Sequence, residues 1–583
     1  MKKTLYYLAS FIATGTLLAS CSQDGPDDKK DSDNNLNTAG IAIDNGTIPA
    51  FSQEIPQWNG RKATDADLDA VGNDNDIYHE LNTFTKKVTV EFNGNTATVT
   101  STYPTIQHNI QGAYVTVDFL TPDLSGVEII AKGSTTDGGL KIYGAGKFKL
   151  TLDGVAIESK LGPAINSQCK KRVFVNLVDG TTNTLTDAAT YSADPFYVGT
   201  GTVYNEDRKG CFFAEGDMIV SGTGTLEVRG KNKHGIAVDG YMVTRPGSTI
   251  AVTQAAKNCI QLKGDETDQI GLWVKGGYLY ALTDAPAGKA IKTDQNIRID
   301  GGILELNTTG DAIYESDVDD TSSSACLKAD TYISITAGDV ALRSTGKGGK
   351  GINASTTVTL AGGNVGVSCT GTKYVYSETM TASAKAIKAD QSISLTGGEL
   401  TVLSTGNSDG CRGIESDTEI NLSGSDVTVY AYDDALNSPT VSVSGNSVLN
   451  AFSVDDDGIR AKETFTMTGG NVTAVGGSSP AGGINCNSSA GFNVSGGTLI
   501  VMGGNLSNGP GSVSLGHRTW IGLTADKGTE ISVSSATQSL MTFTMPRTIE
   551  GGTILIASQA LPSSGALSLK KSNGTQCAPD SNR

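Results

Sequence analysis

Short runs of alternating apolar and polar residues fill most of the chain, and one short phrase recurs between them. The phrase consists of a small residue, an aliphatic residue, any residue, and then a small or polar pair. Copies stand at 235–239, 290–294, 326–330, 351–355, 386–390, 413–417, 458–462 and 483–487. Each copy is followed by period-two alternation, which is typical of a half-buried β-strand, and no helical period accompanies it. The pattern therefore predicts a β-repeat protein.

Glycine pairs end many of the alternating segments, at intervals of about 21 to 29 residues that some insertions stretch to about 36. The pairs are 276–277, 301–302, 362–363, 397–398, 469–470 and 496–497. This period lies in the range of solenoid repeats. Two or three short strands per period, with glycine at the corners, predict an all-β protein built as a right-handed parallel β-helix from about residue 125 to 505.

The two ends of such a solenoid need caps, because an open end exposes a sheet edge that invites aggregation. Residues 85–125 alternate strongly and are predicted to cap the N-terminal end of a domain spanning 85–505. Residues 506–583 lack the phrase and are expected to form a β-rich cap or terminal rungs. Inside the rod, Cys211, Cys259 and Cys326 occupy the small position of the phrase, and we interpret them as stacked core thiols rather than disulfides.

Composition and charge exclude several classes of function. The 583 residues include 72 glycines, only 18% charged residues and a net charge of −17. A phosphate backbone would be repelled by that charge, so no nucleic-acid partner is expected. Four histidines, with neither an HExxH motif nor a Cys-x-x-Cys pair, leave little material for a zinc or thiol-redox site.

The first residues are typical of an export signal. Lys2 and Lys3 precede an apolar stretch that ends in Leu18-Ala19-Ser20-Cys21, so residues 1–20 are predicted to be a signal peptide. The Leu-Ala-Ser-Cys run resembles a bacterial lipobox, which implies that Cys21 becomes the lipidated first residue. Residues 21–84 begin with an acidic tether that resembles the surface-export signals of Bacteroidota lipoproteins; a plain spacer is the alternative. The expected location is the outer membrane, at the cell surface, with only the lipid in the membrane.

Several runs between residues 139 and 236 resemble a bacterial carbohydrate-binding domain family that is built on a right-handed parallel β-helix. They are 139–143, 149–155, 162–166, 179–187, 206–210, 215–216 and 233–236. The resemblance covers about residues 85 to 500. It implies a calcium-containing β-helix that binds cellulosic or acidic polysaccharide, often as a surface lipoprotein. One departure concerns calcium: Asp239-Gly240, Lys257-Asn258 and Gly288-Lys289 stand where we expect Asp-Asp or Asp-Gly in the family, which puts calcium on those rungs in doubt.

Calcium prefers six to eight oxygen ligands, which aspartates on neighbouring rungs could supply. The candidates lie in or just before copies of the phrase: Asp311, Asp433, Asp434, Asp455, Asp456 and Asp457. Adjacent carboxylates repel one another unless a cation lies between them. The alternative is that they are solvated turn residues that form Asx turns.

Sugar binding usually needs a flat aromatic ring, and Trp273, Tyr278 and Tyr280 offer the best platform, with both tyrosines on one strand face. Core or edge packing is the alternative role. Lysines precede the phrase at Lys289, Lys350 and Lys385, and lie inside it at Lys292, Lys328 and Lys388. If they stack, they form a basic ladder suited to uronate or sulfate groups; solubilising surface charge is the alternative.

Three functions fit these observations. The first is a non-catalytic, surface-tethered lipoprotein that binds a polysaccharide, acidic or cellulosic, and contains structural calcium. The second is a calcium-dependent, pectate-lyase-like polysaccharide lyase, in which a lysine or arginine of lowered pKa removes a proton beside a calcium-neutralised carboxylate. The third is an adhesin or spacer without a glycan ligand. No base and metal cluster can be assigned to one rung from the sequence, so the first function is favoured.

Overall fold

The structure is a computed structural model that describes residues 35–36, 54–63, 71–121, 124–193, 206–267, 270–506 and 508–579. The predictions for the signal peptide, for Cys21 and for the acidic stretch after it lie outside these residues. The chain divides into two compact units, one of residues 56–399 and one that contains residues 400–583. The described residues contain two short 3-10 helices, η1 (His79–Leu81) and η2 (Ser489–Gly491), and none of their helices is long and apolar enough to cross a membrane.

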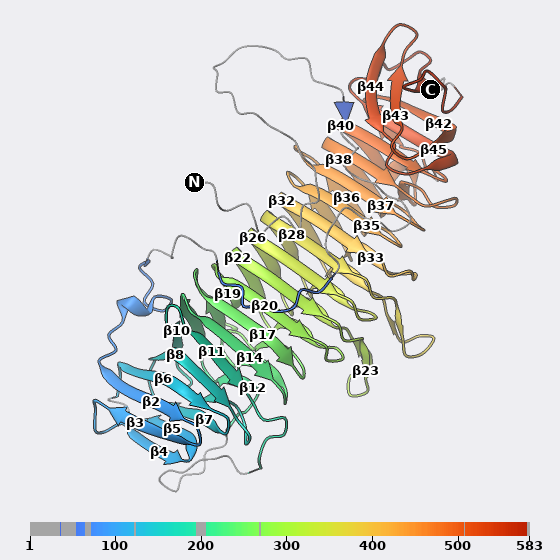
Figure 1. The fold of residues 1–583 in the computed structure, drawn as a ribbon. Helices are drawn as coiled ribbons and strands as arrows, with labels where there is room; N and C mark the ends of the chain where they lie inside the picture. The colour runs from blue at the N-terminus through green and yellow to red at the C-terminus, as the bar shows by residue number, and fades with distance from the viewer. Residues whose placement is uncertain are drawn as a thin grey trace, which may run out of the picture. The chain divides into compact units, whose positions relative to one another are not determined.

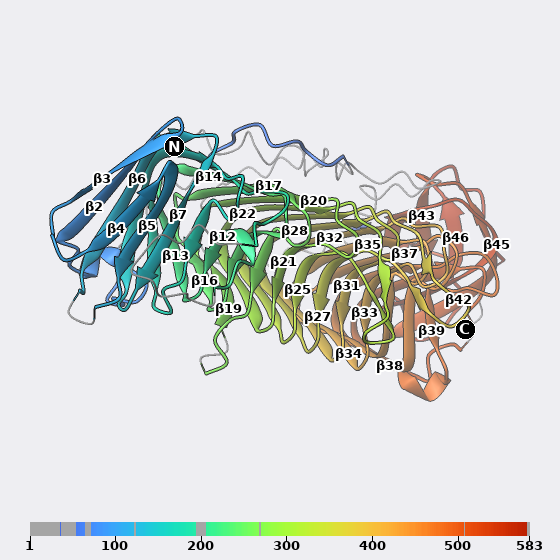
Figure 2. The same cartoon turned by 90° about the horizontal axis from the view of Figure 1, so that it is seen from below.

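The unit of residues 56–399 is a parallel β-helix made of three sheets (Figure 1). The sheet that carries the recurring phrase is called the phrase sheet, and its strands lie side by side in Figure 2. It consists of β5 (Ala113–Phe119), β7 (Gly138–Gly144), β9 (Ile165–Ser167), β12 (Gly210–Ala214), β15 (His234–Val238), β18 (Ile260–Leu262), β21 (Lys289–Thr293), β25 (Ala325–Ala329), β27 (Lys350–Ala354) and β31 (Lys385–Ala389).

The other two sheets of this unit share several long strands. The second sheet contains β2 (Lys86–Asn93), β6 (Val127–Thr135), β8 (Phe148–Glu158), β10 (Val173–Leu177), β13 (Met218–Gly222), β16 (Met242–Thr244), β19 (Ile270–Val274), β22 (Asn296–Thr308), β26 (Ile333–Ser344) and β28 (Val358–Cys369). The third sheet contains β11 (Thr182–Thr186), β14 (Thr225–Gly230), β17 (Thr249–Ala255) and β20 (Tyr278–Thr283), followed by the second halves of β22, β26 and β28.

The core of this unit is a set of ladders of identical side-chain types. The aliphatic residue of the phrase pairs with its counterpart on the next rung, and each of these residues is at most 2% exposed. The ladder runs through Ile236, Ile260, Ile291, Leu327, Ile352 and Ile387. Cys211, Cys259 and Cys326 are buried free thiols beside it, as predicted, but they do not stack directly, because Gly235 and Ala290 lie between them. The all-β class and the parallel β-helix are therefore confirmed.

The N-terminal end of this unit is closed by two antiparallel strands. β3 (Thr96–Ser101) pairs with β2, and β4 (Gln107–Gln111) pairs with β5. The predicted cap region contains these strands, but β2 and β5 already pair in parallel with β6 and β7. The first complete rung therefore begins before residue 125.

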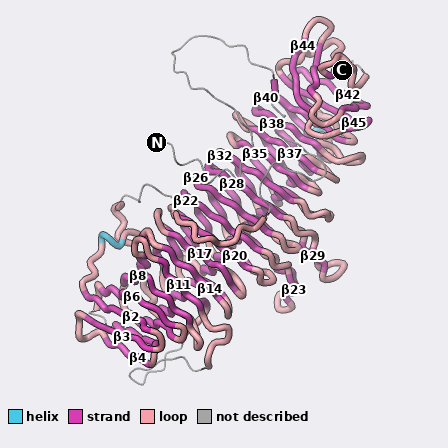
Figure 3. The backbone as a smooth tube through the Cα atoms, in the orientation of Figure 1, coloured by secondary structure: helices cyan, strands magenta, loops and turns pink. Residues whose placement is uncertain are grey.

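Two hairpins interrupt the repeat of this unit and project beyond the rungs on the same side (Figure 3). One is formed by β23 (Ile313–Glu315) and β24 (Asp320–Ser322) and directly precedes β25. The other is formed by β29 (Tyr374–Val375) and β30 (Thr381–Ala382) and precedes β31.

The unit that contains residues 400–583 continues the same type of repeat and ends in a cap. β32 (Ser392–Ser404) contains the boundary between the units. Its parallel rungs are formed by β33 (Arg412–Ser416), β34 (Glu419–Leu422), β35 (Asp426–Ala431), β36 (Leu436–Val443), β37 (Val448–Ser453), β38 (Ile459–Val475), β39 (Ile484–Cys486), β40 (Phe492–Gly503) and β41 (Ser512–Val513).

An antiparallel β-cap closes this second unit around the buried side chain of Trp520. It is formed by β42 (Gly516–Ala525), β43 (Glu530–Ser534), β44 (Ser539–Thr544), β45 (Ile549–Ser558) and β46 (Ser568–Lys571). β45 pairs antiparallel with β40 and so covers the edge of the last parallel rung. These strands lie within residues 506–583, where the sequence predicts a β-rich cap or terminal rungs.

Glycine is required at one corner of the rungs because the chain turns there in the left-handed region. Gly277, Gly302, Gly338 and Gly363 have φ angles of +90°, +84°, +104° and +82°. A Cβ on Gly302 would lie 2.6 Å from the carbonyl oxygen of Gly277, and one on Gly363 would lie 2.7 Å from that of Gly338. Each corner glycine therefore allows both the turn and the close approach of the next rung.

We expect Gly302→Ala to lower the melting temperature more than Gly154→Ala. Gly154 also has a positive φ, of +67°, but the nearest atom to a Cβ there is 4.0 Å away. Both variants bear the cost of a left-handed side chain, about 1–2 kcal/mol, and only Gly302→Ala adds the contact with the rung below. Thermal unfolding followed by circular dichroism measures both; equal losses would show that the close approach carries no cost.

Candidate functional site

Three carboxylates gather where two successive rungs of the second unit begin. Asp433 and Asp434 lie three and two residues before β36, and Asp456 lies three residues before β38, at the position equivalent to Asp433. One oxygen of each lies within 4.8 Å of the others, and we call this group the rung cluster. The phrase repeats its position from rung to rung, so acidic residues placed just before it must approach one another.

The rung cluster contains buried oxygen atoms that lack donors. Asp433 and Asp434 are 4% and 2% exposed. Asp433 Oδ2 accepts from the Gly410 amide at 2.6 Å, and Asp434 Oδ2 accepts from Asn437 Nδ2 at 2.5 Å. Within the described part of the chain, neither Asp434 Oδ1 nor Asn437 Oδ1 has a hydrogen-bond partner. Buried acceptors normally have a partner, so this arrangement fits a divalent cation that prefers oxygen ligands.

Electrostatics at the rung cluster point the same way. Burial, reinforced by the neighbouring charge of Asp433, raises the pKa of Asp434 to about 7. Burial and the charges of Asp457 and Asp433 raise the pKa of Asp456 to about 6. Arg412 Nε lies 3.4 Å from Asp433 Oδ2 and 3.2 Å from Asp434 Oδ2 without hydrogen-bond geometry, and the guanidinium also binds Glu415 at 2.7 Å. One guanidinium therefore offsets only part of the negative charge.

The other three predicted metal ligands do not join the rung cluster. Asp457 is buried but satisfied, since it accepts from the Gly482 amide at 2.9 Å and from Asn485 Nδ2 at 2.8 Å. Asp455 is exposed. Asp311 is also exposed and accepts from the Lys347 amide at 2.7 Å, as expected of a turn residue.

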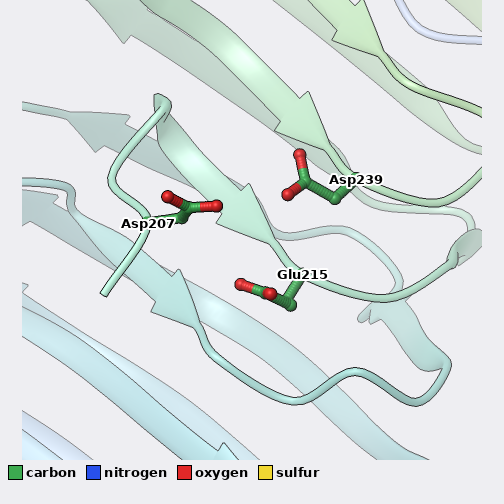
Figure 4. Close-up of side chains that lie close together, drawn as sticks. All are labelled: Asp207, Glu215 and Asp239. Carbon is green, nitrogen blue, oxygen red and sulfur yellow. The ribbon is translucent and has the colours of Figure 1, made fainter. Parts of the chain in front are cut away.

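A second acidic group lies in the first unit and was not predicted. Asp207 precedes β12, Glu215 follows β12 and Asp239 follows β15, and their oxygens approach within 4.8 Å (Figure 4). The strand register could have predicted part of this group. Ala214 pairs with Val238, so Glu215 and Asp239, which follow them, are neighbours. Lys209 Nζ already binds Asp207 at 2.9 Å and Asp239 at 2.5 Å. A cationic side chain therefore occupies the place that a metal ion would need.

The predicted lysines stack in two columns on the phrase sheet. The first residues of the strands form one column, which we call the outer column: Lys289, Ala325, Lys350 and Lys385 pair in that order. The residues three positions further on form a second column, which we call the inner column: Lys292, Lys328, Asn353 and Lys388 pair in that order. The inner lysines bind aspartates of the same face: Lys292 binds Asp294 at 3.1 Å, Lys328 binds Asp330 at 3.3 Å and Lys388 binds Asp390 at 2.7 Å. The inner column is therefore a ladder of ion pairs rather than of free positive charge.

Two of the outer lysines, Lys289 and Lys350, lie at the foot of the first hairpin. Lys289 Nζ donates to Ser322 Oγ at 3.0 Å, and Lys350 Nζ donates to Ser323 Oγ at 2.7 Å. Burial lowers the pKa of Lys289 to about 8, although Glu315 opposes the shift. An ammonium that donates to a neutral hydroxyl group keeps its positive charge and can still attract an anion.

The predicted aromatic platform is covered. Tyr278 and Tyr280 do share one face, but both are buried, at 3% and 1% exposed. Trp58 packs over them with ring centroids 5.8 and 5.6 Å away, and its Nε1 donates to Glu227 at 2.9 Å. Trp273 lies on a different sheet, where it donates to Asp300 at 2.9 Å. The three predicted residues therefore do not form one open platform.

Comparison with known proteins identifies a family. Segments 125–277, 246–373 and 377–455, together more than half of the chain, match the model of a family described as "carbohydrate-binding domain-containing protein". A solved structure of a polysaccharide lyase-like protein from C. thermocellum, a gadolinium derivative, is similar at 15% identity over 62% of this chain and 96% of that one, with a TM-score of 0.24. No curated protein matches the chain. The resemblance stated from the sequence is confirmed by the family match.

Proposed function

Because this chain belongs to the family of carbohydrate-binding domain-containing proteins, we propose that it is a non-catalytic, surface-displayed lipoprotein that binds an acidic polysaccharide. The observation that carries this proposal is the outward face of the phrase sheet, where lysine and amide side chains recur in register. An extended polymer repeats its groups along its length, and strands about 4.8 Å apart repeat theirs in the same direction.

The two columns supply different contacts to such a polymer. The outer column offers ammonium groups, and Lys289 is the best placed for a uronate or sulfate because its Nζ binds a hydroxyl. The inner column offers paired donors and acceptors, such as Lys292 with Asp294 and Asp330, which suit sugar hydroxyls. Together they favour a polysaccharide with regularly spaced negative groups.

The cations beside the acidic groups argue for binding over lyase chemistry. A lyase needs a base of lowered pKa next to its metal. Partial burial lowers the pKa of Lys209, but hydrogen bonds with Asp207 and Asp239 raise it overall. Burial likewise lowers the pKa of Arg412, yet Glu415, Asp434 and Asp433 raise it overall. Neither side chain has the property of a base.

Calcium has a structural role in this proposal. The rung cluster, with Asn437 beside it, would hold the ion through Asp433, Asp434 and Asp456. A bound cation would neutralise carboxylates that the register brings together, two of them buried and Asp456 exposed, and would tie two successive rungs to each other.

Display at the surface rests on the sequence alone. The lipobox-like Leu18-Ala19-Ser20-Cys21 run and the acidic stretch after it support attachment to the outer membrane through a lipid on Cys21.

Affinity electrophoresis with polygalacturonate tests the glycan proposal. The wild-type protein should be retarded, and Lys289→Ala with Lys385→Ala should weaken binding about tenfold or more, since charge-assisted contacts are lost. Lys132→Ala with Lys147→Ala is the matched control, because it removes the same charge from side chains that lie off the phrase sheet. Equal weakening by both pairs would indicate only non-specific charge, and an unsaturated product absorbing in the ultraviolet would favour a lyase.

Retardation should also fall as pH rises from 7 to 9. Lys289, with a pKa near 8, is charged below that pH and neutral above it. Lys289→Arg should abolish the fall within this range, because guanidinium stays protonated.

Calcium should raise the melting temperature of the metal-free protein, because a ligand that binds only the folded state stabilises it by RT ln(1 + [L]/Kd). Asp434→Asn should remove most of this increment, and Asp455→Asn, outside the rung cluster, should leave it intact. Calorimetry with calcium and with chelator measures both. A melting temperature of the wild type that is indifferent to calcium contradicts the metal site.

Cys21→Ala should abolish labelling with palmitate and release the protein from the membrane fraction. Protease treatment of intact cells should digest the wild-type protein if it is displayed outside. Persistent lipid labelling of Cys21→Ala would disprove the anchor, and protection of the wild type from protease would disprove the display.

A further inference from the structure

The two inserted hairpins come together over a rung that has none. β27 lies between β25 and β31, and the chain reaches it through Gly346-Lys347-Gly348-Gly349 instead of a hairpin. Gly348 has a φ of +69°, and a Cβ there would lie 3.0 Å from the Cβ atoms of Ala312 and Ala382. These alanines lie at the bases of the two hairpins. Because Gly348 has no side chain, the bases of the two hairpins can approach each other there.

The hairpins join through a pair of stacked tyrosines. The rings of Tyr314 and Tyr376 have centroids 4.1 Å apart and an interplanar angle of 9°. The Tyr314 hydroxyl donates to Asp319 Oδ1 at 2.7 Å, which fixes that ring from its own hairpin. Tyr376 is 58% exposed, and Val318, in the turn of the first hairpin, and Val375, in β29, are 67% and 61% exposed. An exposed apolar patch of this kind is typical of a binding surface.

The groups around this patch select the chemistry of its ligand. Asp317, Asp319 and Asp320 are all exposed at the tip of the first hairpin. A flat ring face accepts the apolar face of a sugar, and carboxylates accept hydrogen bonds from sugar hydroxyls. The same carboxylates repel uronates and sulfates, so the tip disfavours the acidic polymer that suits the lysine columns.

We propose that the tips of the two hairpins, through the stacked rings of Tyr314 and Tyr376, bind an uncharged polysaccharide. The inference rests on the proposed function, because it adds a second site to the same glycan-binding face. Ser322 and Ser323 of the first hairpin accept hydrogen bonds from Lys289 and Lys350. The hairpin site is therefore adjacent to the outer lysine column. One face of the unit thus presents an uncharged-sugar site above an acidic-sugar site.

Affinity electrophoresis with hydroxyethyl cellulose as the uncharged probe and polygalacturonate as the acidic probe tests the two sites separately. Tyr376→Ala should weaken binding to hydroxyethyl cellulose about three- to tenfold and leave binding to polygalacturonate unchanged. Tyr376→Phe should bind as the wild type does, because the ring carries the contact. Tyr103→Ala is the matched control, since Tyr103 is 38% exposed and lies in the N-terminal cap.

Each other outcome has a definite meaning. Unchanged binding of Tyr376→Ala to hydroxyethyl cellulose, or retardation of the wild type by polygalacturonate alone, overturns the hairpin site and leaves the proposed function standing. Retardation by neither probe overturns both. Concentration-dependent association of the wild type in sedimentation, abolished by Tyr376→Ala, would assign the patch to a second copy of the chain and overturn the sugar site. Equal melting temperatures of the variants exclude a folding defect as the cause.

Discussion

Parallel stacking in register is the constraint on which the rest of the molecule depends. Each residue of a rung pairs with the residue in the same position of the next rung, so one choice of side chain is repeated along a column. The aliphatic ladder through Ile236 and Ile260 is the favourable result, because every added rung buries the same apolar face. The corner glycines at Gly302 and Gly338 are the corresponding requirement, since only a residue without a Cβ permits this backbone approach. The aliphatic core and the glycine corners are thus two consequences of the same repeat.

The same constraint makes charge difficult, because like charges in a column repel at the spacing of adjacent strands. The protein offsets such charge in two ways. The inner lysines each bind an aspartate two residues further on, as Lys388 binds Asp390. Elsewhere an opposite charge is brought from another segment: Lys141 binds Glu206 at 2.8 Å with both side chains nearly inaccessible. At the rung cluster, Asp434 remains only partly compensated, and this difference distinguishes a candidate metal centre from the other acidic groups.

The sequence patterns predicted the features that recur at the same position in each rung. They missed the contacts made by segments that are distant in the sequence. The phrase predicted the core ladder, both lysine columns and the three aspartates that gather in the rung cluster, because each depends on position within a single repeat. Tyr278 and Tyr280 were rightly placed on one face, yet nothing near them in sequence shows that Trp58 covers them. Asp207 was missed for a related reason: it reaches its partners from a segment ahead of β12, outside the recurring pattern.

Insertions are therefore the place where such a β-helix can acquire selectivity. An inward position is fixed by the core, and an outward position is tied to its neighbours above and below, so neither can change alone without affecting a whole column. A hairpin leaves the rung and returns to it, which frees its tip from that register. Two hairpins that flank one bare rung can then meet, as Tyr314 and Tyr376 do above the space left by Gly348. In the proposed function, the regular face would provide an extended surface for a polymer, and the departures from regularity would provide the individual contacts that distinguish one sugar from another.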